Sequence, residues 1–137
     1  MNTWLVKTEP GCWSWDDQQK KGIEHWDGVR NWHAARNMQM MKIGDLAFFY
    51  HTGKEKQIVG IVRIVKEYYP DHTDETGKFG MVDVETVKEL KRPVTLAEVK
   101  ADHRFADLPL VRQSRLSVQP VDEKSWQALC AMGGVKP

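Results

Sequence analysis

The sequence predicts an α+β fold, in which a mainly antiparallel barrel or curled sheet of about five strands carries short helices on its outside. Short segments with strand composition are more numerous than helical ones. Helix-capping patterns mark the start of several short helices. The segments do not alternate in the regular strand–helix–strand order of a parallel sheet. With 137 residues, the chain is expected to form a single domain, residues 1–137.

Five segments have the composition of strands. TWLVKT is stopped by Pro10 and Gly11, and LAFFYH follows a Gly-Asp turn. IVGIVRIV is almost continuously apolar and continues toward Tyr69, whereas MVDVETV alternates between apolar and polar residues as a half-buried strand does. RLSVQPV contains Pro120, which indicates an edge or an end. The predicted strands are therefore 3–8, 46–51, 58–65, 81–87 and 115–121.

Four helices are expected between or after these strands. Ser14 precedes an acidic residue by three positions, which predicts a capped helix that ends near Gly22. Asp27-Gly28 marks a turn, and a helix is predicted from Asn31 to about Met41. Capping residues at 95 and 122 predict the helices 95–101 and 123–132, while 71–78 is predicted to be a polar, solvated loop.

Composition and charge limit the classes of function. The formal net charge is only +1, whereas a protein that contacts many phosphates of a long duplex usually has a strong basic excess. No apolar run approaches the ~20 residues that cross a bilayer, and no secretory signal is evident, so a cytoplasmic protein without membrane contact is expected. Cys12 and Cys130 are expected to be free thiols, although the sequence leaves a single disulfide open. A monomer is expected.

Motifs for catalysis, metal binding and cofactor binding are absent from the sequence. There is no H-E-x-x-H, G-x-S-x-G, Walker or G-x-G-x-x-G pattern, and the histidines lack zinc-ligand spacing. Lys7 and Glu9 lie on the same side of an extended strand. An ion pair is a simpler interpretation of these two residues than a catalytic acid–base pair. We therefore expect no enzyme activity, no metal and no cofactor.

Large aromatic residues occur together with hydrogen-bonding residues in three separate stretches, 7–13, 25–37 and 48–52, and a fourth stretch, 111–121, adds further hydrogen-bonding residues. Flat rings with polar groups around them suit a nucleobase that has left its stack. Trp4 and Trp126 are expected in the core, Trp13 and Trp15 are equally compatible with core and pocket, and the polar neighbours of Trp26 and Trp32 slightly favour a pocket. Arg30 could instead cap a carbonyl or pair with Asp27, and the arginines of the fourth stretch could be solvated.

Eight stretches in order resemble the EVE-domain family of the PUA-like superfamily, which is related to the YTH and ASCH domains. The resemblance rests on WLVKTEP (4–10), WSWDD (13–17), WDGVRNWHAARN (26–37), MKIGDLAFFYH (41–51), IVGIVRIVKEYYPD (58–71), MVDVETV (81–87), PVTLAEVKAD (93–102) and RLSVQPV (115–121). It implies a PUA-like pseudo-barrel with a pocket for a modified cytosine or adenine in DNA or RNA.

The resemblance also implies site residues. Trp32 would be the main stacking wall, and Arg30 could also contact phosphate. The implied ligand-binding set is Trp13, Trp26, Val29, Arg30, Asn31, Trp32, Tyr50, His51, Thr52 and Ser114. Lys7, Arg112 and Arg115 would contact the nucleic-acid backbone.

The sequence departs from the family at Thr8 and Thr52, where serine is common, and in a short loop at 71–79. The extra methyl groups are expected to narrow the pocket. Three other functions stay open at this point: a general PUA-like RNA-binding module without modification specificity, a small-molecule-binding protein, and an enzyme that uses Glu9, Tyr50 or His51.

Overall fold

The computed structural model describes residues 1–137 and contains one six-stranded sheet. The strands are β1 (Thr3–Thr8), β2 (Ile23–Trp26), β3 (Leu46–His51), β4 (Gln57–Pro70), β5 (Gly80–Thr95) and β6 (Val118–Val121). Their order in the sheet is β2-β5-β4-β3-β1-β6. All neighbours are antiparallel except β1 and β3, which are parallel. The predicted α+β, mainly antiparallel class is confirmed.

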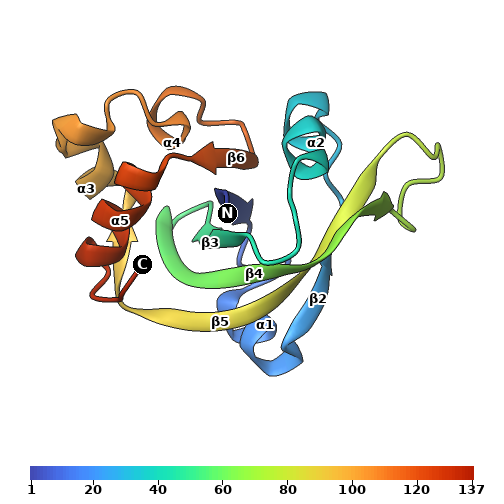
Figure 1. Ribbon diagram of the computed structural model, residues 1–137, viewed down its shortest axis with the longest axis horizontal. Helices are drawn as coiled ribbons and strands as arrows, with labels where there is room; N and C mark the ends of the chain where they lie inside the picture. Colours follow the sequence, from blue (N-terminus) through green and yellow to red (C-terminus); the bar gives the residue numbers. More distant parts are fainter.

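The helices lie outside the curled sheet (Figure 1). They are α1 (Trp15–Lys21), α2 (Trp32–Gln39), α3 (Leu96–Ala101), α4 (Pro109–Arg112) and α5 (Glu123–Met132), with a 3-10 turn, η1 (His103–Phe105). Figure 1 shows α3, α4 and α5 together at one end of the molecule, while α2 stands next to β6 and the β4–β5 loop projects from the other end. No helix has the length and apolar character required to cross a membrane.

Side-chain caps explain where three of the helices begin. Ser14 accepts a hydrogen bond from the Asp17 backbone N–H at 3.1 Å, and the Asp17 carboxylate accepts one from the Ser14 N–H at 3.0 Å. Thr95 begins α3 with the same reciprocal arrangement, and Asp122 caps α5. Each cap satisfies backbone donors that have no partner inside the helix.

Two apolar clusters fill the two faces of the sheet, and β3 contributes to both because its side chains alternate. Phe49 packs with Trp15 and Trp26 on one face. On the other face, Phe48 stacks on Trp126 with ring centroids 3.9 Å apart. The core positions predicted for Trp4 and Trp126 are confirmed, since each is 3% exposed. The expectation of free thiols is also confirmed.

Several element boundaries differ from the predicted ones. Strand β2 and the short helical segments η1 and α4 were not predicted, so the sheet has six strands instead of five. Strand β5 extends to Thr95 because its second half pairs with the start of β4, although it carries many charged residues. Strand β6 begins only at Val118, because the Leu116 N–H bonds back to the Gln113 carbonyl in a turn.

Candidate nucleic-acid interface

A cavity of about 440 Å³ lies between the end of β1 and the end of β2; we call it the β1–β2 cavity. Three strands separate β1 from β2 in the sheet, so the sheet curls until these strands face the same space. The cavity is lined by Lys7, Thr8, Cys12, Trp13, Glu24, His25, Trp26, Asp27, Gly28, Val29, Arg30 and Ser117. The curled sheet therefore brings together two of the aromatic–polar stretches and Ser117 of the stretch 111–121.

The apolar part of the cavity consists mainly of Trp13, Trp26 and Val29. Trp26 is 6% exposed and packs edge-on against Phe49. Trp13 is half-buried, and its indole N–H donates to the Gln18 side-chain carbonyl at 2.9 Å. A ring held in this way loses little freedom when a flat ligand stacks on it.

The polar part of the cavity offers both donors and acceptors. Lys7 and Arg30 can only donate hydrogen bonds, whereas the carboxylates of Glu24 and Asp27 can only accept them. The Lys7 ammonium donates to the Ser114 carbonyl at 2.9 Å, so the expected ion pair with Glu9 is wrong. Burial lowers the pKa of Lys7. The cavity can thus bind an uncharged ring that has donors and acceptors on its edge.

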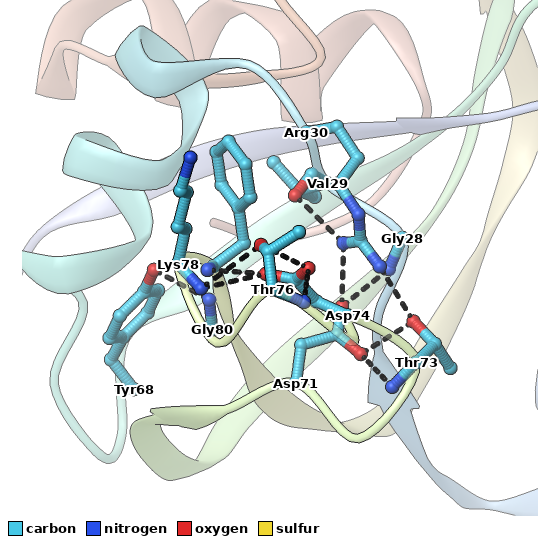
Figure 2. Close-up of polar contacts among 11 residues, drawn as sticks. Gly28, Val29, Arg30, Tyr68, Asp71, Thr73, Asp74, Thr76, Lys78 and Gly80 are labelled. Carbon is cyan, nitrogen blue, oxygen red and sulfur yellow. Dashed lines mark hydrogen bonds and ion pairs between the residues drawn. The ribbon is translucent and has the colours of Figure 1, made fainter.

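Asp71 holds the turn that carries Gly28 and Arg30, as Figure 2 shows. One carboxylate oxygen accepts from the Gly28 N–H at 2.8 Å and from the Arg30 guanidinium at 3.0 Å. The other accepts from the Thr73 N–H at 2.7 Å and from the Thr73 hydroxyl at 2.6 Å. Burial acts to raise the pKa of Asp71, but these hydrogen bonds outweigh it and hold the pKa well below its ordinary value.

The contacts of Asp71 correct two expectations. Arg30 pairs with Asp71 and not with Asp27, and it also donates to the Val29 carbonyl at 3.1 Å. Residue 71 is buried, so the loop 71–78 is not fully solvated. The donor atoms of Asp27, Asp71 and His72 lie within 4.8 Å of one another. Because both oxygens of Asp71 already accept hydrogen bonds, this cluster does not form a free set of metal ligands.

The rest of the β4–β5 loop packs against α2. The Asp74 carboxylate accepts from the backbone N–H groups of Thr76, Lys78 and Phe79, which closes the loop (Figure 2). The Phe79 ring lies against Trp32, with centroids 4.4 Å apart. Trp32 is 53% exposed and does not line the β1–β2 cavity, in contrast to its expected role as the main wall.

Six other candidates lie in two neighbouring cavities. Asn31 lines a cavity of about 370 Å³ between α2 and α4, together with Arg112, Ser114 and Arg115. Its side-chain oxygen caps α2 by accepting from the Ala34 N–H at 3.0 Å. Tyr50 and Thr52 line a cavity of about 210 Å³ between β3 and α3, and Ser114 lines this cavity as well; we call it the β3–α3 cavity.

His51 lies in the interior and lines none of these three cavities. It is 6% exposed, and its Nε2 accepts a hydrogen bond from the Trp15 N–H at 3.0 Å. Its Nδ1 lies 2.8 Å from the Glu55 carboxylate. These partners require the neutral tautomer with the proton on Nδ1, which gives His51 a role in holding the start of α1.

The ligand-binding residues predicted from the sequence do not include several residues of the β1–β2 cavity that lie next to them. Thr8, Cys12, Glu24, His25, Asp27 and Ser117 line the β1–β2 cavity beside the residues that were selected. Glu24 and His25 were missed with β2, which was not recognised as a strand. The His25 ring is 3.0 Å from Asp83 and 2.9 Å from the Tyr69 hydroxyl, and the hydrogen bond with Asp83 raises the pKa of His25.

Comparison with known proteins agrees with this architecture. The chain is 34% identical to human (Homo sapiens) thymocyte nuclear protein 1 over 168 residues, which cover 98% of this chain and 75% of that protein. An NMR structure of a protein from Rhodopseudomonas palustris has a TM-score of 0.92 at 54% identity and covers 98% of this chain and 94% of that one. An ASCH protein from Zymomonas mobilis shares the fold, with a TM-score of 0.61 at 11% identity. This match covers 96% of this chain and 99% of that one.

A crystal structure of human THYN1 in complex with DNA that contains 5-methylcytosine has a TM-score of 0.91 at 33% identity, and the match covers 100% of both chains. The model of the EVE domain family matches residues 2–132. Together, the PUA-like architecture and the near-complete family match show that this chain belongs to the EVE-domain family.

Proposed function

We propose that this protein is a non-catalytic nucleic-acid-binding module that takes a modified base, in the first place 5-methylcytosine, into the β1–β2 cavity. The observation that carries the proposal is the combination of rings and edge groups in that cavity. Trp13, Trp26 and Val29 offer apolar surface, and Asp27 and Lys7 offer an acceptor and a donor. The relative solved with 5-methylcytosine-containing DNA supports this choice of base.

The chemistry of cytosine suits these groups. Its exocyclic amine is a donor that a carboxylate such as Asp27 can accept, and its ring acceptors can receive N–H groups from Lys7 or Arg30. The 5-methyl group requires an apolar contact, which Val29 or a tryptophan ring can supply. A base can enter a cavity of this kind only from a single strand or after it is flipped out of a duplex.

The experiment compares two tryptophans that the structure separates. Trp13→Ala removes a ring from the β1–β2 cavity, whereas Trp32→Ala removes one that packs on Phe79 outside it. The probe is a labelled single-stranded DNA with one 5-methylcytosine, and its affinity is measured by fluorescence anisotropy. Since a base–aromatic stack contributes ~1–3 kcal/mol, Trp13→Ala should weaken binding about 5- to 150-fold.

Trp32→Ala should change the affinity less than about threefold, because the ring lies outside the cavity. Circular dichroism and urea unfolding serve to check that both variants are folded. The opposite order, with binding lost in Trp32→Ala and kept in Trp13→Ala, would place the base against α2. Equal binding of both variants and of the native protein would contradict stacking on either ring.

A further inference from the structure

The β3–α3 cavity has no place in the proposed base contact, yet it adjoins the β1–β2 cavity. Lys7 lines both of them. The cavity measures about 210 Å³. Its lining consists of Lys7, Tyr50, Thr52, Gly53, Lys56, Leu96, Lys100, Leu110 and Ser114. A nucleotide chain that leaves the β1–β2 cavity past Lys7 would therefore meet this space next.

The charge of the β3–α3 cavity is positive. Lys7, Lys56 and Lys100 line it, and no carboxylate does. None of these three lysines forms an ion pair within the protein. The Lys7 ammonium donates to the Ser114 carbonyl. Glu9 is an acid next to the cavity: its carboxylate lies beside Gly53 and accepts a hydrogen bond from the Thr52 hydroxyl at 3.4 Å. The lysines exceed this single acid, so the cavity favours an anion.

The buried Tyr50 supplies a second and independent sign of a ligand. This side chain is 3% exposed, lines the cavity, and makes no hydrogen bond through its hydroxyl within the protein. The fully buried polar atoms without a partner are the Trp15 indole nitrogen and the Gln119 side-chain oxygen, so the Tyr50 hydroxyl is accessible and can donate to a group bound in the cavity. Burial raises the pKa of Tyr50 to about 12, so the hydroxyl remains a donor at neutral pH. The cavity thus combines lysine charge with an unused donor.

The backbone at Lys56 indicates that this lysine is held in place. Lys56 is the one non-glycine residue with a positive φ, 46°, which is a conformation that L residues adopt at some cost. Its carbonyl accepts a hydrogen bond from the Leu96 N–H at 2.8 Å, which ties the β3–β4 turn to the start of α3. This tie joins the segments that carry Lys56 and Lys100.

We infer that the β3–α3 cavity binds the phosphodiester that adjoins the base in the β1–β2 cavity, through Lys56, Lys100 and the Tyr50 hydroxyl. The inference rests on the proposed function and specifies its substrate as a polynucleotide chain, not a free nucleoside. Lysine ammonium groups and a hydroxyl donor are suited to phosphate oxygens. Lys7 would lie between base and phosphate because it lines both cavities.

Calorimetric titration at several salt concentrations tests this site. The probes are 5-methyl-2′-deoxycytidine, a single-stranded pentanucleotide with a central 5-methylcytosine, and the same pentanucleotide without the methyl group. The variants are Lys56→Gln/Lys100→Gln, which keeps most of both side chains, and Tyr50→Phe. The matched control is Lys20→Gln/Lys21→Gln, which removes two charges from the exposed end of α1.

We expect Lys56→Gln/Lys100→Gln to bind the nucleoside as the native protein does and the pentanucleotides about tenfold more weakly at low salt. Each lost phosphate contact should reduce the slope of log K against log salt by ~0.7. Tyr50→Phe should weaken pentanucleotide binding without a change of slope, since it removes no charge. The Lys20/Lys21 control should bind like the native protein.

Native-like pentanucleotide affinity and slope in Lys56→Gln/Lys100→Gln would overturn the phosphate site and leave the proposed base recognition intact. An equal loss of nucleoside and pentanucleotide binding would also overturn it, since that loss would be structural. If the double variant weakens both pentanucleotides and the methyl group makes no difference, the phosphate site stands and modified-base recognition fails. Absence of binding by the native protein to every probe would overturn both.

Discussion

Asp71→Asn is the substitution that tests most sharply how the cavity is built. The Asp71 side chain is fully buried and accepts four hydrogen bonds, including one from the Arg30 guanidinium. Asparagine has nearly the same shape, but it carries no charge and replaces one acceptor oxygen with a donor NH₂ group. At least one N–H or hydroxyl donor around residue 71 would then face another donor.

The expected loss follows from these contacts. Removing one partner of an enclosed ion pair costs ~3–5 kcal/mol. The Arg30 side chain remains 39% exposed, so water can solvate it when the carboxylate is lost. We therefore expect the free energy of unfolding to fall by about 2–3 kcal/mol, near the contribution of one hydrogen bond to a charged group. For a chain of this size, the corresponding decrease in Tm is roughly 6–12 °C.

The effect of Asp71 should also depend on pH. Its pKa is lower in the folded than in the unfolded protein, so the unfolded chain binds the proton more readily. The stabilisation is complete above pH ~4, the pKa of an unfolded aspartate, and is lost as the pH falls toward the folded value. The difference between native protein and variant should therefore be largest at pH 7 and should narrow below pH 4.

Urea unfolding at pH 7 and at acidic pH provides the measurement. Glu75→Gln is the control, because it removes an exposed carboxylate from the same loop. Glu75→Gln should have the same urea midpoint of unfolding as the native protein. The reasoning would be refuted if Asp71→Asn matched the native protein at pH 7, or if its difference from the native protein stayed constant as the pH was lowered.

Two further predictions concern the support of the cavity. Gly60→Ala should lower the free energy of unfolding, measured by urea unfolding, by ~1–3 kcal/mol or more, because a Cβ at residue 60 would overlap the Trp15 ring. An unchanged urea midpoint would contradict the packing of Trp15 on Gly60. NMR titration should give His25 a pKa above ~6.5, and Asp83→Asn should lower it. The His25–Asp83 pair stabilises the fold fully below pH ~6.5, and this stabilisation is lost as the pH rises through the pKa of His25 in the folded protein. An unchanged pKa of His25 in Asp83→Asn would contradict the hydrogen bond.

Local patterns were sufficient for the parts of the fold that depend on neighbours in sequence. The strands at 3–8 and 46–51 were predicted with the observed bounds, because apolar segments there are flanked by turn residues. The helix caps at Ser14 and Thr95 are present as expected. Strand β2 was missed because three of its four residues are not fully buried, and its pairing with β5 is visible only in the fold.

The cavity could be predicted only in part, for a related reason. Composition and the family resemblance together placed Trp13, Trp26 and Arg30 near a ligand, and the structure gathers these residues in one cavity. Trp32 has equally polar neighbours, but its position is set by Phe79, which is distant in sequence. His51 looked available, yet the N–H of Trp15 uses its Nε2. Long-range contacts of this kind leave no local pattern.

The most direct test of the central claim is the ratio of affinities for two single-stranded oligonucleotides that differ only in one 5-methyl group on cytosine. If the methyl group enters the β1–β2 cavity next to Val29 or a tryptophan ring, its burial contributes ~0.8 kcal/mol, and the methylated strand should bind about fourfold more tightly. Equal affinity for the two strands, or no binding to either, would contradict recognition of 5-methylcytosine by this cavity.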